Sequence, residues 1–138
     1  MKSPKKSTGF TLIEALMAAM LIGLAIAALA ASSGAFTTYN AAGVDLSTAE
    51  FLIEEIREKT ASMAFNDLSN CNYPAAVDAN GDLIDGFSAY AQNVTVDYVN
   101  QDDLTHPVTG PKDFRRVTVK ILKNNREITS SSWIRANY

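Results

Sequence analysis

The chain has 138 residues, a net charge of −3, one cysteine (Cys71) and one histidine (His106). Its length accommodates one small domain and one membrane segment. A single cysteine excludes an intramolecular disulfide bond. A lone histidine lacks the partners of a zinc site, and the sequence has no nucleophile motif and no glycine-rich phosphate loop. We therefore do not expect an enzyme.

Charge is distributed unevenly along the chain. Residues 1–44 have three bases and one acid (+2), residues 45–103 have two bases and twelve acids (−10), and residues 112–138 have seven bases and two acids (+5). This polarity predicts either complementary packing between neighbouring subunits or two solvated faces of one domain.

The N-terminus combines a basic leader, residues 1–9, with a long apolar segment. Three leader lysines precede the apolar run, which favours a cytoplasmic N-terminus. No charged residue lies between Glu14 and Asp45. A helix needs about 20 apolar residues to cross a bilayer, so we predict a transmembrane half of a helix over residues 10–35.

Two other interpretations of this segment remain open. An ordinary secretory signal peptide also has a basic start, an apolar core and small residues near its cut site, which Ala28–Ser33 could supply. The carboxylate of Glu14 is unusual in such a core, and the helical pattern continues past this point to about Phe65. An uncleaved single-span anchor that does not assemble is the second alternative.

The stretch Gly9-Phe10-Thr11-Leu12-Ile13-Glu14, between the leader and the apolar run, resembles the N-terminal signature of type IV pilins and of type II secretion pseudopilins. By position, this resemblance implies that a prepilin peptidase cuts after Gly9 and that Phe10 is then N-methylated. It also implies partners, namely other pilin or pseudopilin subunits and an inner-membrane assembly platform. The implied location is the bacterial inner membrane, single-pass with a periplasmic head, and then a filament.

Glu14 would be the fifth residue of the processed chain, where the family keeps a glutamate. Cutting after Gly9 creates an amine on Phe10 that is largely protonated near neutral pH. A positive charge is unfavourable at a helix N-terminus, whereas a carboxylate in the first turn is favourable. We therefore expect Glu14 to compensate its own amine or that of a neighbouring subunit, which would set the axial register of a filament.

Residues 36–66 predict an amphipathic half of the same helix. The spacing of apolar residues predicts one buried face, and Glu55 and Lys59 are placed to form an i,i+4 ion pair. A coiled-coil stalk is less consistent, because the heptad spacing is not sustained. The residues expected on the buried face are Leu46, Ala49, Leu52, Ile53, Ile56 and Met63.

The segment after the helix is rich in turn formers. Four oxygen-bearing side chains lie close together there, at Asp78, Asn80, Asp82 and Asp85. The spacing resembles a calcium loop but fails the EF-hand template, because Ala89 stands where the glutamate would be. Asn80-Gly81 is also a strong turn signal by itself, so a plain turn is the expectation and a calcium site the alternative.

Residues 67–138 predict a connecting loop followed by an antiparallel sheet. Alternating patterns over 93–99, 114–122 and 126–134 predict three strands, and Asn124-Asn125 predicts a two-residue hairpin turn. Residues 101–112, which include His106, are expected to form an exposed loop. Trp133 and Tyr138 are expected to close the core edge or to anchor a contact. The predicted fold class is α+β and pilin-like, with a long N-terminal helix packed on a small sheet.

A basic strip near the C-terminus raises DNA binding as a second function, as in pilin-like proteins of competence systems. From Phe10 onward the chain has nine bases against fifteen acids, which opposes non-specific nucleic-acid binding. We therefore expect a structural subunit of a pilus or pseudopilus. The short head and the absent disulfide favour a minor pilin or minor pseudopilin. The strip consists of Lys112, Arg115, Arg116, Lys120, Lys123, Arg126 and Arg135.

Overall fold

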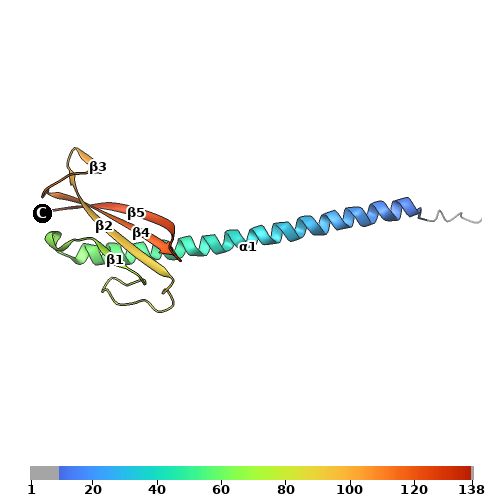
Figure 1. The fold of residues 1–138 in the computed structure, drawn as a ribbon, viewed down its shortest axis with the longest axis horizontal. Coiled ribbons are helices and arrows are strands. Elements are labelled where there is room, and N and C mark those ends of the chain that lie inside the picture. Colours follow the sequence, from blue (N-terminus) through green and yellow to red (C-terminus); the bar gives the residue numbers. More distant parts are fainter. Residues whose placement is uncertain (1–9, 138) are drawn as a thin grey trace, which may run out of the picture. The chain divides into compact units, whose positions relative to one another are not determined.

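The computed structural model describes residues 10–137, and the chain divides into two compact units, Met1–Ala42 and Gly43–Tyr138. One long helix, α1 (Leu12–Ser62), is followed by a 3-10 turn, η1 (Phe65–Asp67). Five strands complete the chain (Figure 1). They are β1 (Cys71–Tyr73), β2 (Tyr90–Asn100), β3 (Asp103–Pro107), β4 (Phe114–Lys123) and β5 (Arg126–Ala136).

The first unit is the apolar part of α1. Every large apolar side chain from Leu12 to Leu29 is exposed. Within the part of the chain that is described, α1 is the one helix long and apolar enough to cross a membrane. An apolar surface of this extent marks contact with lipid or with another protein.

The second unit packs the last part of α1 against the sheet. Ala49, Leu52, Ile53 and Ile56 are at most 5% exposed and join the core with the sheet residues. The predicted buried face is therefore correct at its centre and wrong at its ends, since Leu46 is 43% exposed and Met63 is only half-buried. The helix ends at Ser62, short of the predicted Phe65.

The predicted ion pair between Glu55 and Lys59 is not formed. Glu55 instead accepts a hydrogen bond from the backbone N–H of Ala79 at 2.8 Å, and Arg57 pairs with Glu54 at 2.8 Å. An exposed i,i+4 pair contributes only a few tenths of a kcal/mol, whereas an unpaired backbone donor near the core costs more. Tertiary contact thus outweighs the local pairing.

The sheet is antiparallel throughout, in the order β1-β2-β4-β5, with β3 also paired to β2. The three predicted strands are confirmed and are longer by a few residues, since they span 90–100, 114–123 and 126–136. Alternation along β4 places Val117, Val119 and Ile121 on the core face with no exposed surface. The predicted hairpin turn is also confirmed, because Asn124 and Asn125 adopt φ of 50° and 67°, the left-handed values of a type I′ turn.

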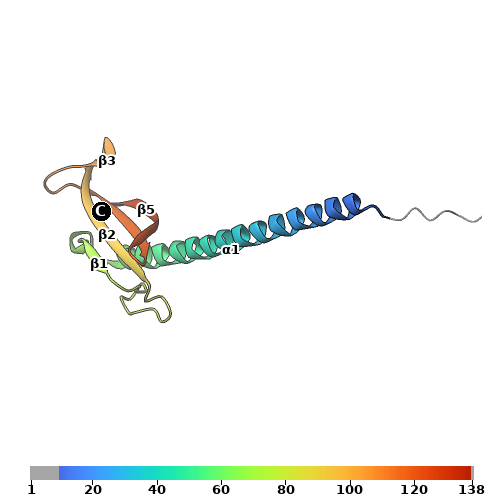
Figure 2. The same cartoon turned by 45° about the vertical axis from the view of Figure 1, so that its right-hand side comes forward.

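Two strands were not predicted. β1 has only three residues, and β3 is formed by residues expected to be an exposed loop. All five residues of β3 are solvent-exposed, so no alternation of apolar and polar residues predicts this strand. Figure 2 shows β3 at the end of β2, apart from α1.

A buried polar side chain joins the connecting segment to the helix and the sheet. Gln92 in β2 has no exposed surface. Its Oε1 accepts a hydrogen bond from Val77 N–H at 2.8 Å, and its Nε2 donates to the carbonyls of Val77 at 3.1 Å and Leu52 at 3.2 Å. Leu68, Ala76 and Val77 of the connecting segment are themselves buried. Trp133 packs partly buried against the same core, as predicted, whereas Tyr138 lies outside the described residues.

Candidate functional site

The start of α1 is the first candidate site. Gly9, predicted to precede the cut, lies outside the described residues, whereas Phe10 is described and 76% exposed. Thr11 caps the helix: its carbonyl accepts hydrogen bonds from the N–H groups of Glu14 and Ala15, both at 3.1 Å, and its Oγ1 lies 3.4 Å from the Glu14 nitrogen. Glu14 itself is exposed in the first helical turn.

Sequence reasoning missed the cap, although a signal for it was present. Thr11-Leu-Ile-Glu14 fits the capping-box pattern, in which a threonine and a glutamate three residues on satisfy the first free backbone N–H groups of a helix. A cut after Gly9 would leave Phe10 and Thr11 ahead of the helix. The cap would therefore persist after processing.

A polar cluster joins the head to α1 near the start of the second unit. Oδ1 of Asp45 accepts hydrogen bonds from Lys123 Nζ at 2.6 Å and from Tyr90 O–H at 2.8 Å. The hydrogen bond from Lys123, followed by that from Tyr90, lowers the pKa of Asp45, and the bond to Asp45 raises the pKa of Lys123. The first charged residue after Glu14 is thus held by the β4–β5 hairpin and by β2.

The calcium candidates lie in a tight turn closed by a bridge between Val77 and Leu83. Oδ1 of Asp78 accepts hydrogen bonds from the N–H groups of Asn80 and Asp82 at 2.8 and 2.9 Å, and these contacts lower the pKa of Asp78, with the bond from Asp82 the largest cause. The Lys59 ammonium lies against Gly81, which has a left-handed φ of 94°. Within the described residues no cluster of His, Cys, Asp and Glu is arranged to hold a metal. Calcium binding by Asp78, Asn80, Asp82 and Asp85 stays the untested alternative to a plain turn.

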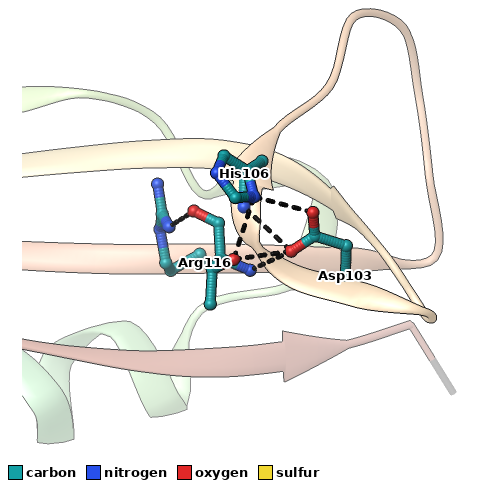
Figure 3. Close-up of polar contacts among 4 residues, drawn as sticks. Asp103, His106 and Arg116 are labelled. Atoms are coloured by element: carbon teal, nitrogen blue, oxygen red, sulfur yellow. Dashed lines mark hydrogen bonds and ion pairs between the residues drawn. The ribbon is translucent and has the colours of Figure 1, made fainter.

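His106 belongs to β3 rather than to a loop, and Figure 3 shows it with Asp103 and Arg116. Its Nδ1 lies 2.7 Å from Asp103 Oδ2 and 3.0 Å from Thr105 Oγ1. Hydrogen bonds from Thr105, followed by that from His106, hold the pKa of Asp103 well below its usual range. A catalytic triad needs the acid and the hydroxyl on different nitrogens of the ring. Here both contact Nδ1, so these are local contacts within β3 that lack the geometry of a triad.

The basic strip is largely engaged within the head. Arg115 is buried and donates to the Leu68 carbonyl at 2.6 Å, and Arg135 donates to the Thr60 and Met63 carbonyls at 2.5 and 3.2 Å. Three further residues form ion pairs with acids of the head: Arg116 with Asp97, Lys120 with Glu127 and Lys123 with Asp45. Acidic and basic halves of the sequence therefore meet within one domain, and few of the basic side chains remain for a phosphate backbone.

The comparison with known families bears on the N-terminal part of the chain. A family model that describes the prokaryotic N-terminal methylation motif matches residues 4–30. No curated protein and no solved structure matches the chain significantly. The matched residues include Gly9, Phe10, Glu14 and most of the exposed apolar half of α1. The chain therefore carries the N-terminal signature of type IV pilins, on an α+β pilin-like fold.

Proposed function

We propose that the chain is a structural subunit of a type IV pilus or of a type II secretion pseudopilus. The observation that carries this proposal is the methylation motif at residues 4–30, placed where a capped helix begins an exposed apolar run. Such a run suits storage in a membrane and helix-to-helix assembly afterwards. The role is mechanical and needs no catalytic site.

Processing comes first in this scheme. A prepilin peptidase cuts the bond between Gly9 and Phe10, and the new amine of Phe10 is methylated. The chain is then held in the bacterial inner membrane with its head in the periplasm, and an inner-membrane assembly platform adds it to other pilin or pseudopilin subunits. The small head favours a minor subunit of the filament.

Glu14 is the residue that we expect to direct assembly. Its carboxylate is exposed in the first turn of α1, within reach of an incoming amine. An ion pair at about 4 Å contributes up to about 4 kcal/mol at an effective dielectric constant of about 20. We expect much of this energy to be offset by desolvation, since both charges leave water.

The test must separate this role from helix capping, because Glu14 also occupies the third position of the capping box. Glu14→Gln retains a side chain suited to the box but loses the charge, whereas Thr11→Ala removes the cap at a cost of about 1 kcal/mol and keeps the charge. We expect Glu14→Gln to be cut and methylated normally but to enter filaments about tenfold less or worse, since tenfold corresponds to only about 1.4 kcal/mol. Thr11→Ala should assemble better than Glu14→Gln.

The readouts are intact mass of the processed chain and the fraction of chain recovered in filaments from the cells that produce it. Glu58→Gln is the matched control, because Glu58 is an exposed glutamate of the same helix outside the apolar half. Full assembly of Glu14→Gln would refute the role of its charge. A chain that is never cut between Gly9 and Phe10 would refute the proposed function as a whole.

A further inference from the structure

Strand β5 has an open outer edge. It pairs with β4 on one side only, and an edge strand turns the N–H and C=O groups of alternate residues outward. Among the described residues, no hydrogen bond outside the β4 ladder reaches the backbone of β5 between Ile128 and Ile134. This central stretch contains no charged residue and no proline, the usual devices that protect an edge.

On the opposite side of the sheet, the backbone of β2 is covered. β1 and β3 cover the two ends of β2. Between them, the Asn70 side chain accepts a hydrogen bond from Val96 N–H at 2.7 Å, and Val108 N–H donates to the Tyr98 carbonyl at 2.8 Å. Prolines at 74 and 107 limit β1 and β3. The outermost strands on that side have only three and five residues, whereas β5 has eleven, so β5 offers the longer template for a further strand.

A groove of about 630 Å³ runs between α1 and the open edge of β5. Phe51, which is 46% exposed, and Ile53 supply its apolar surface. The β5 side consists of the small polar residues 129–131. Glu50 and Glu54 also line it, and Glu54 is paired with Arg57. Glu50 has no ion-pair partner among the described residues, so the groove presents one uncompensated negative charge.

We propose that the open edge of β5 binds an extended segment of a different polypeptide, which adds a strand to the sheet and directs a basic side chain at Glu50. Strand addition of this kind takes its affinity from backbone hydrogen bonds and its specificity from pockets beside the edge. The partner is thus a protein with an exposed, basic, strand-forming segment.

Two arrangements of identical copies fit less well. Pairing of two β5 edges brings no basic side chain to Glu50, because the central stretch of β5 contains no charged residue. Side-by-side stacking of copies in one orientation would place β5 against the β1–β3 edge of the next copy, whose strands have only three and five residues.

The test uses the full chain in detergent micelles and a blocked synthetic peptide, acetyl-Thr-Val-Lys-Val-Thr-Val-Lys-amide. Amide hydrogen exchange of β5 is followed residue by residue. At ten times its dissociation constant the peptide should slow exchange by about tenfold, at alternate positions between Ile128 and Ile134. Two control peptides separate the contribution of backbone hydrogen bonds from that of charge. One is N-methylated at alternate residues, which removes the backbone donors, and the other has glutamate in place of lysine. Both should bind at least tenfold more weakly.

Protein variants locate the site. Ser131→Lys places a charge in the groove and should abolish binding, whereas Ser132→Lys, at an exposed position beside it, should retain it. Glu50→Gln should weaken binding of the lysine peptide and strengthen binding of the glutamate peptide, because it removes an attraction in the first case and a like-charge repulsion in the second. Unaltered β5 exchange at saturating peptide, or equal binding of the N-methylated peptide, would overturn the proposal. Protection of β5 that rises with protein concentration without peptide would also overturn it, in favour of self-pairing. None of these readouts depends on cutting after Gly9 or on filament assembly.

Discussion

Replacing Gln92 by leucine tests whether one buried amide holds the connecting segment to the core. Leucine has a similar volume, so the change leaves little cavity and acts mainly on hydrogen bonds. Gln92 makes three of them, two with Val77 and one with the Leu52 carbonyl. The side chain has no exposed surface, so water cannot replace it without rearrangement.

The magnitude follows from the groups left unpaired. The N–H of Val77 loses its acceptor, which costs about 1–3 kcal/mol for a buried donor. The Leu52 carbonyl also accepts the helical bond from residue 56, so its loss costs less. The leucine recovers some apolar transfer free energy. We expect a net loss of about 2–3 kcal/mol in the free energy of unfolding of the head, which corresponds to about 8–24 °C in melting temperature for a domain of this size.

The assay is thermal and urea unfolding of the full chain in micelles, followed by the near-ultraviolet signal of Trp133. Gln101→Leu is the matched control, because Gln101 is exposed and its replacement should stay within about 0.5 kcal/mol. Equal stability of the Gln92→Leu and Gln101→Leu variants would refute the assignment of Gln92 as a structural hydrogen-bonding centre.

Two further predictions concern the polar clusters of the head. The pKa of Asp45 is lowered in the folded state, so its contribution is present above the ordinary carboxyl value of 3.8 and is lost as the pH falls through the folded pKa. The difference in melting temperature between the wild type and Asp45→Asn should therefore be constant near neutral pH and shrink below about pH 4, and a difference that grows with acid would contradict this. For residues 78–85 we expect equal melting temperatures with calcium and with chelator, because the Asp78 carboxylate already accepts two backbone hydrogen bonds; a higher midpoint with calcium would instead establish the site.

The parts of the fold that could be predicted are those in which periodicity and local chemistry agree. The apolar run of α1, the alternation of Val117, Val119 and Ile121, and the Asn124-Asn125 turn are each recognised from the spacing of residues that are close together in the sequence. Their positions follow from the geometry of helices and strands alone. The N-terminal motif could also be recognised in the sequence, because its residues stand at fixed spacing.

The parts that could not be predicted depend on contacts across the chain. β3 is exposed on all its residues, so it exists through pairing with β2 and through polar contacts of Asp103 and Arg116 rather than through an apolar pattern. Glu55 accepts a hydrogen bond from the backbone N–H of Ala79, which is 24 residues away, and does not pair with Lys59. The capping role of Thr11 is different, because the capping-box pattern Thr11-Leu-Ile-Glu14 is local and can be recognised in the sequence.

The bonds from Arg135 to the end of α1 have a consequence for the timing of folding. Arg135 and Thr60 are 75 residues apart in sequence, and synthesis proceeds at about 5–20 residues per second, so the helix end waits about 4–15 s for its partner. During that interval the stripe that includes Leu52 and Ile56 has no complete sheet to cover it. A nascent chain that pauses before β5 would leave this stripe uncovered, next to the apolar part of the same helix. Synthesis of the eleven residues of β5 therefore ends the period in which the chain is prone to aggregate.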